Sequence, residues 1–341
     1  MKILYAIQGT GNGHISRARE IIPVLQEYGE LDVLLSGTQA DIDLDYPIRY
    51  QFYGLSFIFG KRGGVDIWKT IKCMKLIRLL NEIWSLNVRK YDLIINDFEP
   101  VSAWSCIFKA KRCVGLSHQA AVIHPFSPKP SKMDWFGYLI LKYYAPVKNA
   151  YSFHFRTYAS NINSPIIRQE VRALKTKEEN YYTVYLPAYS DEKIIHVLSK
   201  LEANFMVFSK HSVVRKQMNN VKIVPIDNTV YLQSLSACKG VICGAGFEGP
   251  SEALFLRKKL LVIPMKGQYE QQCNAAALKK IGVPVLNSLH QKHLRALNEF
   301  ILQNNIPLID FPDETEGIIQ KLVLENVEFD YTIPTGSFSF S

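Results

Sequence analysis

Residues 2–19 read KILYAIQGTGNGHISRAR, and this stretch decides the fold. The apolar run KILYAI predicts a short buried strand, and the residues after His14 begin an amphipathic helical pattern. Between them Gly9, Gly11 and Gly13 let the backbone approach a ligand closely. A helix that follows such a turn points its N-terminal amide groups toward an anion. We therefore expect an α/β fold with a ligand site at the first strand-to-helix turn.

His14 distinguishes this turn from the dinucleotide-binding turns that it otherwise matches. It occupies the place of their last glycine, and the second predicted strand closes with Ser36 instead of an acidic residue. A nicotinamide-dependent dehydrogenase is therefore excluded. The helix N-terminus favours the neutral imidazole, which in a cleft is a suitable general base near neutral pH. A helix-capping or core histidine is the alternative.

Strand-like segments alternate with helical patterns through both halves of the chain. They cover residues 2–7, 31–36, 48–54, 91–97 and 112–117, then 181–187, 203–209, 221–226, 239–246 and 259–265. Such alternation predicts parallel sheets with helices on both faces. We expect two doubly wound, Rossmann-like domains over residues 1–160 and 171–327, a linker over 161–170 and an irregular tail over 328–341. Ligands of such domains bind outside the carboxyl ends of the strands, here in the cleft between the two domains.

A second polar constellation lies in the other half, in GAGFEGPSE (244–252) and QYEQQCNA (268–275). A strand ends at Gly244-Ala245-Gly246, and a helix is predicted to start near Pro250 with Glu252 in its first turn. The Glu252 carboxylate either accepts two ribose hydroxyls or complements the helix dipole. The amides of Gln271 and Gln272 both donate and accept, which suits sugar hydroxyls.

Polar residues also follow two strands of the first half. Asp97 and Glu99 end the strand in INDFEP, and His118 and Gln119 follow the strand before LSHQAA. Asp97 or Glu99 could orient His14 or hold a second substrate, and a strand-end cap is the equal alternative for Asp97. His290 and His293 lack a third ligand, so no metal site is expected.

The sequence resembles the family 28 glycosyltransferases of GT-B fold in four motifs, which are GTGNGH, NSPIIR (163–168), GAGFEGPSE and QYEQQCNA. The resemblance implies an inverting, metal-independent enzyme without a cofactor, with a UDP-sugar bound by the second domain and an acceptor by the first. It implies that Glu252 holds the ribose, Gln271 and Gln272 the donor sugar and Arg168 the diphosphate. His14 is implied as the base or as an acceptor-site residue. From its place at the end of a strand, Asp97 is expected as the catalytic partner of His14. The donor would also contact Gly11, Gly13, Gly244, Ala245 and Gly246, and the acceptor Asn12, Glu99, His118 and Gln119.

Two departures from the family pattern concern the donor. Gly244-Ala245 stands where the family often has Arg-Ser, and residues 186–190, LPAYS, replace its glycine-rich turn. Both indicate a divergent branch with its own acceptor, either a cell-envelope glycan or a lipid-linked one. The loop GNGHISR also resembles the GSGHxxR loop of a related hydrolase branch, so nucleotide-sugar hydrolysis stays open as the alternative.

The charge of the chain bears on its partners. The net charge is +9, and residues 61–90 hold eight basic against two acidic residues. Nucleic-acid binding would need basic residues interleaved with stacking aromatics or a recognised fold, and no such signature occurs, so a non-catalytic basic binding role is the weakest alternative. The tryptophans and lysines of 61–90, together with the aromatic stretch 135–144, instead predict association with an anionic membrane surface. Ordinary core helices with their lysines facing water are the alternative.

Cysteine spacing and hydropathy indicate the compartment. The six cysteines form no CxxC pair, so reduced thiols are expected. No secretion signal and no stretch of about 18 apolar residues occurs, which predicts a cytoplasmic protein. If the protein also associates with an anionic membrane, we expect it as a peripheral protein on the inner face of that membrane.

Overall fold

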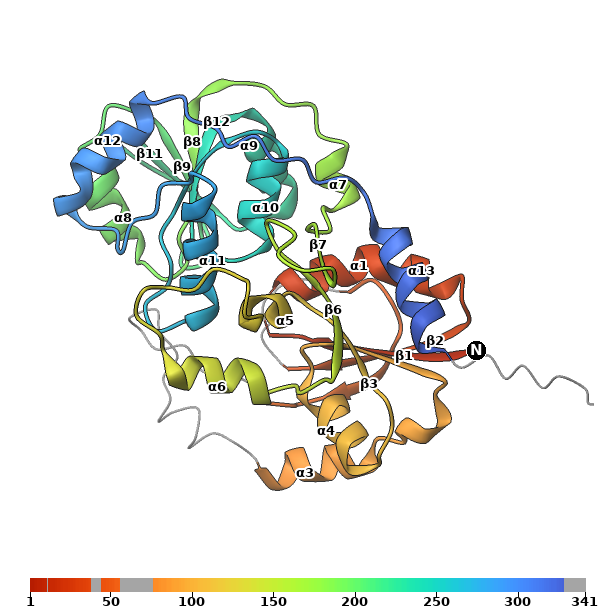
Figure 1. The fold of residues 1–341 in the computed structure, drawn as a ribbon. Coiled ribbons are helices and arrows are strands. Elements are labelled where there is room, and N and C mark those ends of the chain that lie inside the picture. Colours follow the sequence, from red (N-terminus) through yellow and green to blue (C-terminus); the bar gives the residue numbers. More distant parts are fainter. Residues whose placement is uncertain (11, 38–43, 56–75, 328–341) are drawn as a thin grey trace, which may run out of the picture.

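The computed structural model describes residues 1–10, 12–37, 44–55 and 76–327. Gly11, residues 61–75 of the basic segment 61–90 and the predicted tail from residue 328 therefore lie outside the described residues. The chain forms two α/β units, each built on one sheet (Figure 1).

The first unit is a parallel sheet in the order β3-β2-β1-β4-β5-β6-β7. Its strands are β1 (Lys2–Gln8), β2 (Glu30–Ser36), β3 (Ile48–Phe52), β4 (Leu93–Asp97), β5 (Val114–Leu116), β6 (Asn149–Phe153) and β7 (Ile162–Asn163). Its helices are α1 (Asn12–Gln26), α3 (Leu76–Ser85), α4 (Pro100–Phe108), α5 (His118–Ile123) and α6 (Trp135–Tyr143), with a 3₁₀ turn at Val88–Lys90.

The second unit has the order β10-β11-β9-β8-β12-β13, in which only β10 is antiparallel to its neighbour among the described strands. Its strands are β8 (Glu179–Tyr185), β9 (Phe205–Ser209), β10 (Lys216–Met218), β11 (Val221–Pro225), β12 (Cys238–Cys243) and β13 (Lys259–Val262). Its helices are α8 (Asp191–Leu198), α9 (Asn228–Ala237), α10 (Glu248–Phe255), α11 (Tyr269–Lys280) and α12 (Leu294–Leu302), with a 3₁₀ turn at Gln291–His293. The short helix α7 (Gln169–Arg172) precedes it, and α13 (Thr315–Asn326) follows it.

Strand β1 shows why the first sheet is covered on both faces. Ile3, Tyr5 and Ile7 pack with Ile15 of α1, whereas the alternate residues Leu4 and Ala6 pack with Leu79 and Ile83 of α3. A strand buried on both faces is apolar throughout, which is the pattern that KILYAI presents.

The strand order creates a crevice in each unit. In the first sheet the order reverses direction at β1 and β4, and in the second at β8 and β12. Loops on either side of such a switch point diverge, which leaves space outside the carboxyl ends of the strands. The fold class is thus confirmed, and every predicted strand is present. The strands β6, β7 and β10 were not predicted.

The end of the described chain returns to the first unit. Helix α13 lies against α1, at the right of the first sheet in Figure 1, and its residues Ile318, Ile319 and Leu322 join the buried core that α1 also lines. Asn326 of α13 also donates to the Tyr151 hydroxyl of β6 at 3.4 Å. The predicted second domain, 171–327, therefore includes a helix whose contacts lie in the first unit.

Candidate active site

His14 and Asp97 meet at the switch point of the first sheet. His14 lies in the first turn of α1, directly after the glycine turn, and Asp97 is the last residue of β4. The adjacent strands β1 and β4 bring the Nδ1 atom of His14 to 2.8 Å from Oδ1 of Asp97. Burial opposes the charge of Asp97, but Arg17 and His14 hold the pKa of its carboxyl below the usual value. Asp97 is therefore an anion under the imidazole.

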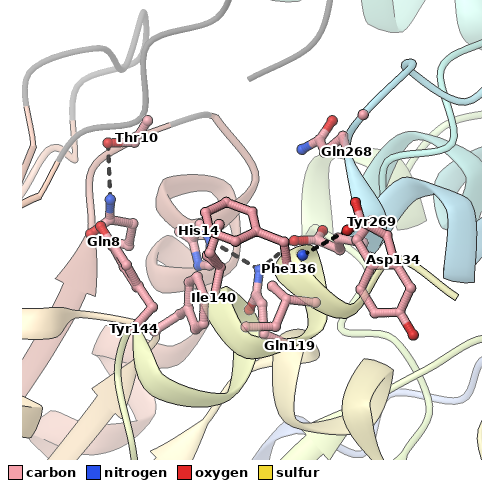
Figure 2. Close-up of a pocket in the computed structure, with 15 residues that line it drawn as sticks. Gln8, Thr10, His14, Gln119, Asp134, Phe136, Ile140, Tyr144, Gln268 and Tyr269 are labelled. Carbon is pink, nitrogen blue, oxygen red and sulfur yellow. Dashed lines mark hydrogen bonds between the residues drawn. The ribbon is translucent and has the colours of Figure 1, made fainter. Parts of the chain in front are cut away.

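The contacts of His14 define its tautomer. A carboxylate only accepts, so the hydrogen of the neutral ring lies on Nδ1 and points to Asp97, which leaves the lone pair on Nε2. Nη2 of Arg17 is also 3.1 Å from Nδ1, but it donates to both Asp97 oxygens at shorter distances. Nε2 is 3.4 Å from the amide nitrogen of Gln119, which also donates to Oε2 of Glu270 at 3.2 Å (Figure 2). Gln119 thus bridges His14 in the first unit to α11 in the second. The Oε1 atom of Gln119 is buried and has no partner among the described residues.

Arg17 holds the other side of Asp97. One turn after His14, its Nη2 donates to both Asp97 oxygens, at 2.7 and 2.8 Å, and its Nη1 donates to Oε1 of Glu248 at 2.6 Å. Only 3% of the Arg17 side chain is exposed. Glu248 begins α10, so this ion pair crosses from the first unit to the second. Gly13 permits the approach, because a Cβ there would overlap the Glu248 carboxylate.

A pocket of about 310 Å³ opens above His14 and extends between the two units (Figure 2). This volume is at the lower end of the range of ligand sites. Its apolar wall comes from the first unit and consists of Phe98, Phe136, Ile140, Leu141 and Tyr144. Gln268, Tyr269 and Glu270 close it from the second unit, and Gln8, Thr10 and Gln119 add polar groups. We call it the His14 pocket.

Phe98 occupies an unusual backbone conformation beside the reactive pair. Its φ is 56°, a left-handed value that side chains larger than glycine rarely adopt. The conformation places the ring parallel to His14, with centroids 6.4 Å apart, and against Tyr144 at 4.8 Å. Such strain concentrates at functional sites. Phe98 and Tyr144 were not among the predicted site residues.

A second pocket, of about 140 Å³, lies at the switch point of the second sheet. Gly244, Gly246 and Gln271 line it, as predicted for donor-binding residues, together with the stretch 185–189 and Tyr231. Gln271 is held by the backbone N–H of Met265, which donates to its Oε1 at 2.9 Å. Ala245 is buried, and its carbonyl accepts from Asn274 at 3.1 Å. We call this cavity the Gly244 pocket.

The predicted donor residues Arg168 and Glu252 pair with each other. Nε and Nη2 of Arg168 donate to the two oxygens of Glu252, at 2.6 and 3.1 Å. Burial raises the pKa of Glu252, and Arg168 opposes that rise. Helix α10 begins at Glu248, two residues before Pro250, so Glu252 lies one turn later than predicted and Glu248 holds the first turn. Neither member of the pair lines the Gly244 pocket, and Gln272 does not line it either.

Two predicted acceptor residues have structural contacts instead of access to the His14 pocket. Both oxygens of Glu99 accept backbone N–H groups of Val101 and Ser102, so its fully buried side chain caps α4. The ring of His118 is also buried, which lowers its pKa. Its nitrogens lie 2.8 Å from the Phe153 carbonyl and 2.8 Å from Oδ1 of Asn274, so it joins α5 to α11. Asn12 is the first residue of α1.

Within the described ranges, no group of three or more His, Cys, Asp or Glu side chains is arranged to hold a metal ion. His290 accepts a hydrogen bond from the backbone of Lys292 and thereby caps the 3₁₀ turn that contains His293.

The comparisons with known proteins identify the family. A family model described as Glycosyl transferase family 1 matches residues 1–307. The chain belongs to this family. A comparison with curated protein sequences gives no match. The matched residues of this glycosyltransferase include both sheets and both pockets.

Solved structures similar to this glycosyltransferase confirm the GT-B fold. The glycosyltransferase of kitacinnamycin has a TM-score of 0.59 and 12% identity, covering 95% of each chain. MurG of Acinetobacter baumannii has a TM-score of 0.56 and 12% identity over 96% of this chain and 99% of its own. UGT89C1 of Arabidopsis thaliana, solved in complex with UDP, has a TM-score of 0.55 and 13% identity over 96% and 94%. The expected GT-B glycosyltransferase is confirmed, and the narrower link to family 28 stays a prediction.

Like Phe98 and Tyr144, Arg17 and Glu248 are site residues that the sequence reasoning missed. Arg17 follows His14 by three positions, so the two side chains share a face of α1, and that spacing was the available signal. The sequence carries no comparable signal for Glu248, because its partner is in the other unit.

Proposed function

We propose that the glycosyltransferase moves a sugar from a UDP-linked donor to an acceptor hydroxyl, with inversion and without a metal ion. The observation that carries this proposal is the His14–Asp97 pair at the floor of a pocket that reaches both units. Similar folds solved with bound UDP support the choice of nucleotide. The Gly244 pocket and its three predicted donor residues support a donor site in the second unit.

The reaction follows from the tautomer of His14. The acceptor hydroxyl gives its proton to Nε2, and its oxygen forms a bond to the anomeric carbon as the bond from that carbon to the diphosphate breaks. Asp97 stabilises the imidazolium that forms, because its carboxylate accepts the Nδ1 hydrogen. The amide groups of the glycine turn and of the α10 N-terminus oppose the charge of the leaving diphosphate.

The walls of the His14 pocket favour an acceptor with an apolar part. Aromatic and aliphatic side chains of α6 form one side, and the polar residues Gln119 and Gln268 line the other. A bare glycan would leave the apolar side unused. This supports a lipid-linked acceptor over a soluble glycan, and it disfavours hydrolysis, because water needs no apolar wall.

Exposed apolar side chains of α3 and α6 support docking on a membrane surface. They are Leu76, Ile77, Leu80 and Trp84 of α3, and Trp135, Phe136, Leu139 and Tyr143 of α6. None of the helices in the described ranges is long and apolar enough to cross a membrane. Association in the interface, with α6 delivering a lipid-linked acceptor to the His14 pocket, fits both observations.

A donor screen tests the proposed function. Thermal unfolding is measured with UDP-, GDP-, dTDP- and CMP-sugars, since a ligand that binds only the folded state raises the melting temperature. Stabilisation by UDP-sugars alone is expected. A product assay that separates free sugar from glycoside then distinguishes transfer from hydrolysis, and release of free sugar at the full rate without acceptor would overturn the proposal.

A further inference from the structure

The Arg17 guanidinium forms ion pairs with two carboxylates that belong to different units. Asp97 is in the first unit and Glu248 in the second, and the Arg17 side chain is almost fully buried between them. Arg17 lines neither the His14 pocket nor the Gly244 pocket, so we look for its function in what it does to its neighbours. Asp97 is in turn divided between Arg17 and His14.

We propose that Arg17 is a positioning residue that transmits the approach of Glu248 in the second unit to the His14–Asp97 pair in the first. The inference rests on the proposed function of His14 as the base. Closing of the two units then changes how readily His14 takes a proton.

The direction of the effect follows from a count of charges. Asp97, Arg17 and Glu248 together carry one net negative charge, which the proton taken up by His14 neutralises. Without Glu248, Asp97 and Arg17 cancel, and a proton on His14 leaves a buried positive charge. Burial makes an uncompensated charge unfavourable. The base is therefore strongest when Glu248 contacts Arg17, which is when the units are closed.

The surrounding groups do not duplicate Glu248. The other titratable groups that face the cluster are Tyr5 of β1, Glu270 of α11 and His118 of α5. Glu270 reaches His14 only through the Gln119 amide. Tyr5 is fully buried beneath Asp97, and its pKa is raised by burial. Glu248 is thus the carboxylate that touches Arg17 from the opposite unit.

The test follows protonation of His14 without any substrate. The full-length protein is labelled with ¹⁵N-histidine, its ring signals are followed against pH by NMR, and a His14→Gln variant identifies the His14 signal. Glu248→Gln is expected to lower the titration midpoint of this signal by about one pH unit, the scale of one nearby charge. Arg17→Met is expected to raise it by a similar amount. Glu252→Gln removes the other paired carboxylate of α10 and is the matched control, with no expected change.

A double variant isolates Arg17 as the connection. In the Arg17→Met background, Glu248→Gln should lower the midpoint by less than it does with Arg17 present, because Arg17 holds the Glu248 carboxylate at the cluster and the effects of a coupled pair are not additive. Arg17→Lys replaces Arg17→Met if the latter does not fold, since one ammonium cannot present the guanidinium fork to two carboxylates. Equal midpoints in the wild type and in Glu248→Gln, or a full Glu248 effect without Arg17, would overturn the proposal. Because NMR needs no turnover, shifted midpoints in a protein that transfers no sugar would refute the proposed function and leave this inference standing.

Discussion

His14 Nδ1 lies 2.8 Å from Asp97 Oδ1, although 83 positions separate the two residues in the chain. The contact exists because β1 and β4 are neighbours in the first sheet and both end at the same edge. The strand order therefore brings Asp97 to His14, and the glycine turn places the His14 imidazole in the first turn of α1. His14 and Asp97 lie on different elements, so each can be replaced and tested by itself.

Replacing His14 tests the base. His14→Ala should lower turnover by about 10²-fold or more, the usual contribution of a general base, and leave UDP affinity nearly unchanged. UDP release measures turnover, and calorimetry measures binding. Asp97→Asn keeps the shape but removes the negative charge, so it should also lower turnover while His14 stays in place. Unchanged turnover in both variants would assign the pair a structural role.

Replacing Glu252 tests the donor site. Glu252→Ala should weaken UDP-sugar binding by about 1.5–3 kcal/mol, the cost of a lost charged acceptor. Glu252→Ala also removes the carboxylate that accepts two hydrogen bonds from Arg168, so the melting temperature should fall as well. Arg168→Gln, alone and combined with Glu252→Ala, separates the two contributions. A lower melting temperature with normal UDP affinity would make the pair purely structural.

His154 predicts a dependence of stability on pH. Its ring is fully buried, and the backbone N–H of Phe155 donates to Nδ1 at 2.9 Å, which requires the unprotonated atom. Burial, with smaller effects of His118 and Lys129, holds the pKa of His154 well below its usual value. The unfolded chain therefore binds more protons than the folded one below about pH 6.5, and stability falls there by up to about 1.4 kcal/mol per pH unit.

The measurement is the melting temperature between about pH 7.5 and about pH 5.5, a range that spans the ordinary histidine titration. His154→Gln should flatten the decline, since it removes the group that must take up a proton. His211→Gln is the control, because it removes an exposed histidine instead of a buried one. The same decline in all three proteins would mean that other groups cause it.

Membrane docking predicts binding to anionic vesicles. Lys and Arg near such a surface contribute about 1 kcal/mol each at low salt, so cosedimentation should occur at low salt and be lost at high salt. Serine at the exposed Trp84 and Trp135 should weaken it. Leu302→Ser replaces an apolar side chain on α12 of the second unit that is even more exposed, and it should not weaken binding. Activity on a soluble glycan without any vesicle binding would contradict the lipid-linked acceptor.

The strands were predictable because each repeats one local pattern, a short apolar run closed by a turn. The strands β6 and β7 were missed for a local reason. In NAYSF the polar residues Asn149 and Ser152 interrupt the apolar run. Ile162–Asn163 lies in a stretch rich in turn-forming residues, where only pairing with β6 makes it a strand. Part of the predicted linker is therefore the edge of the first sheet.

Only those site residues were predictable whose position follows from a single segment of the sequence. His14, Asp97, Gln119, Gly244 and Gln271 follow strands that the sequence marks, and the structure places them at the two pockets. Contacts between the units could not be predicted. The pairing of Arg17 with Glu248, and of Arg168 with Glu252, depends on the relative placement of two separately folded sheets.

The return of α13 to α1 means that the chain passes between the two units twice, once before α7 and once between α12 and α13 (Figure 1). A body tied at one point can swing and spin in any direction, whereas one tied at two points turns easily only about the line that joins them. The two connections therefore restrict the relative movement of the units more than a single one would. Any movement that separates the units must also break the ion pair of Arg17 with Glu248.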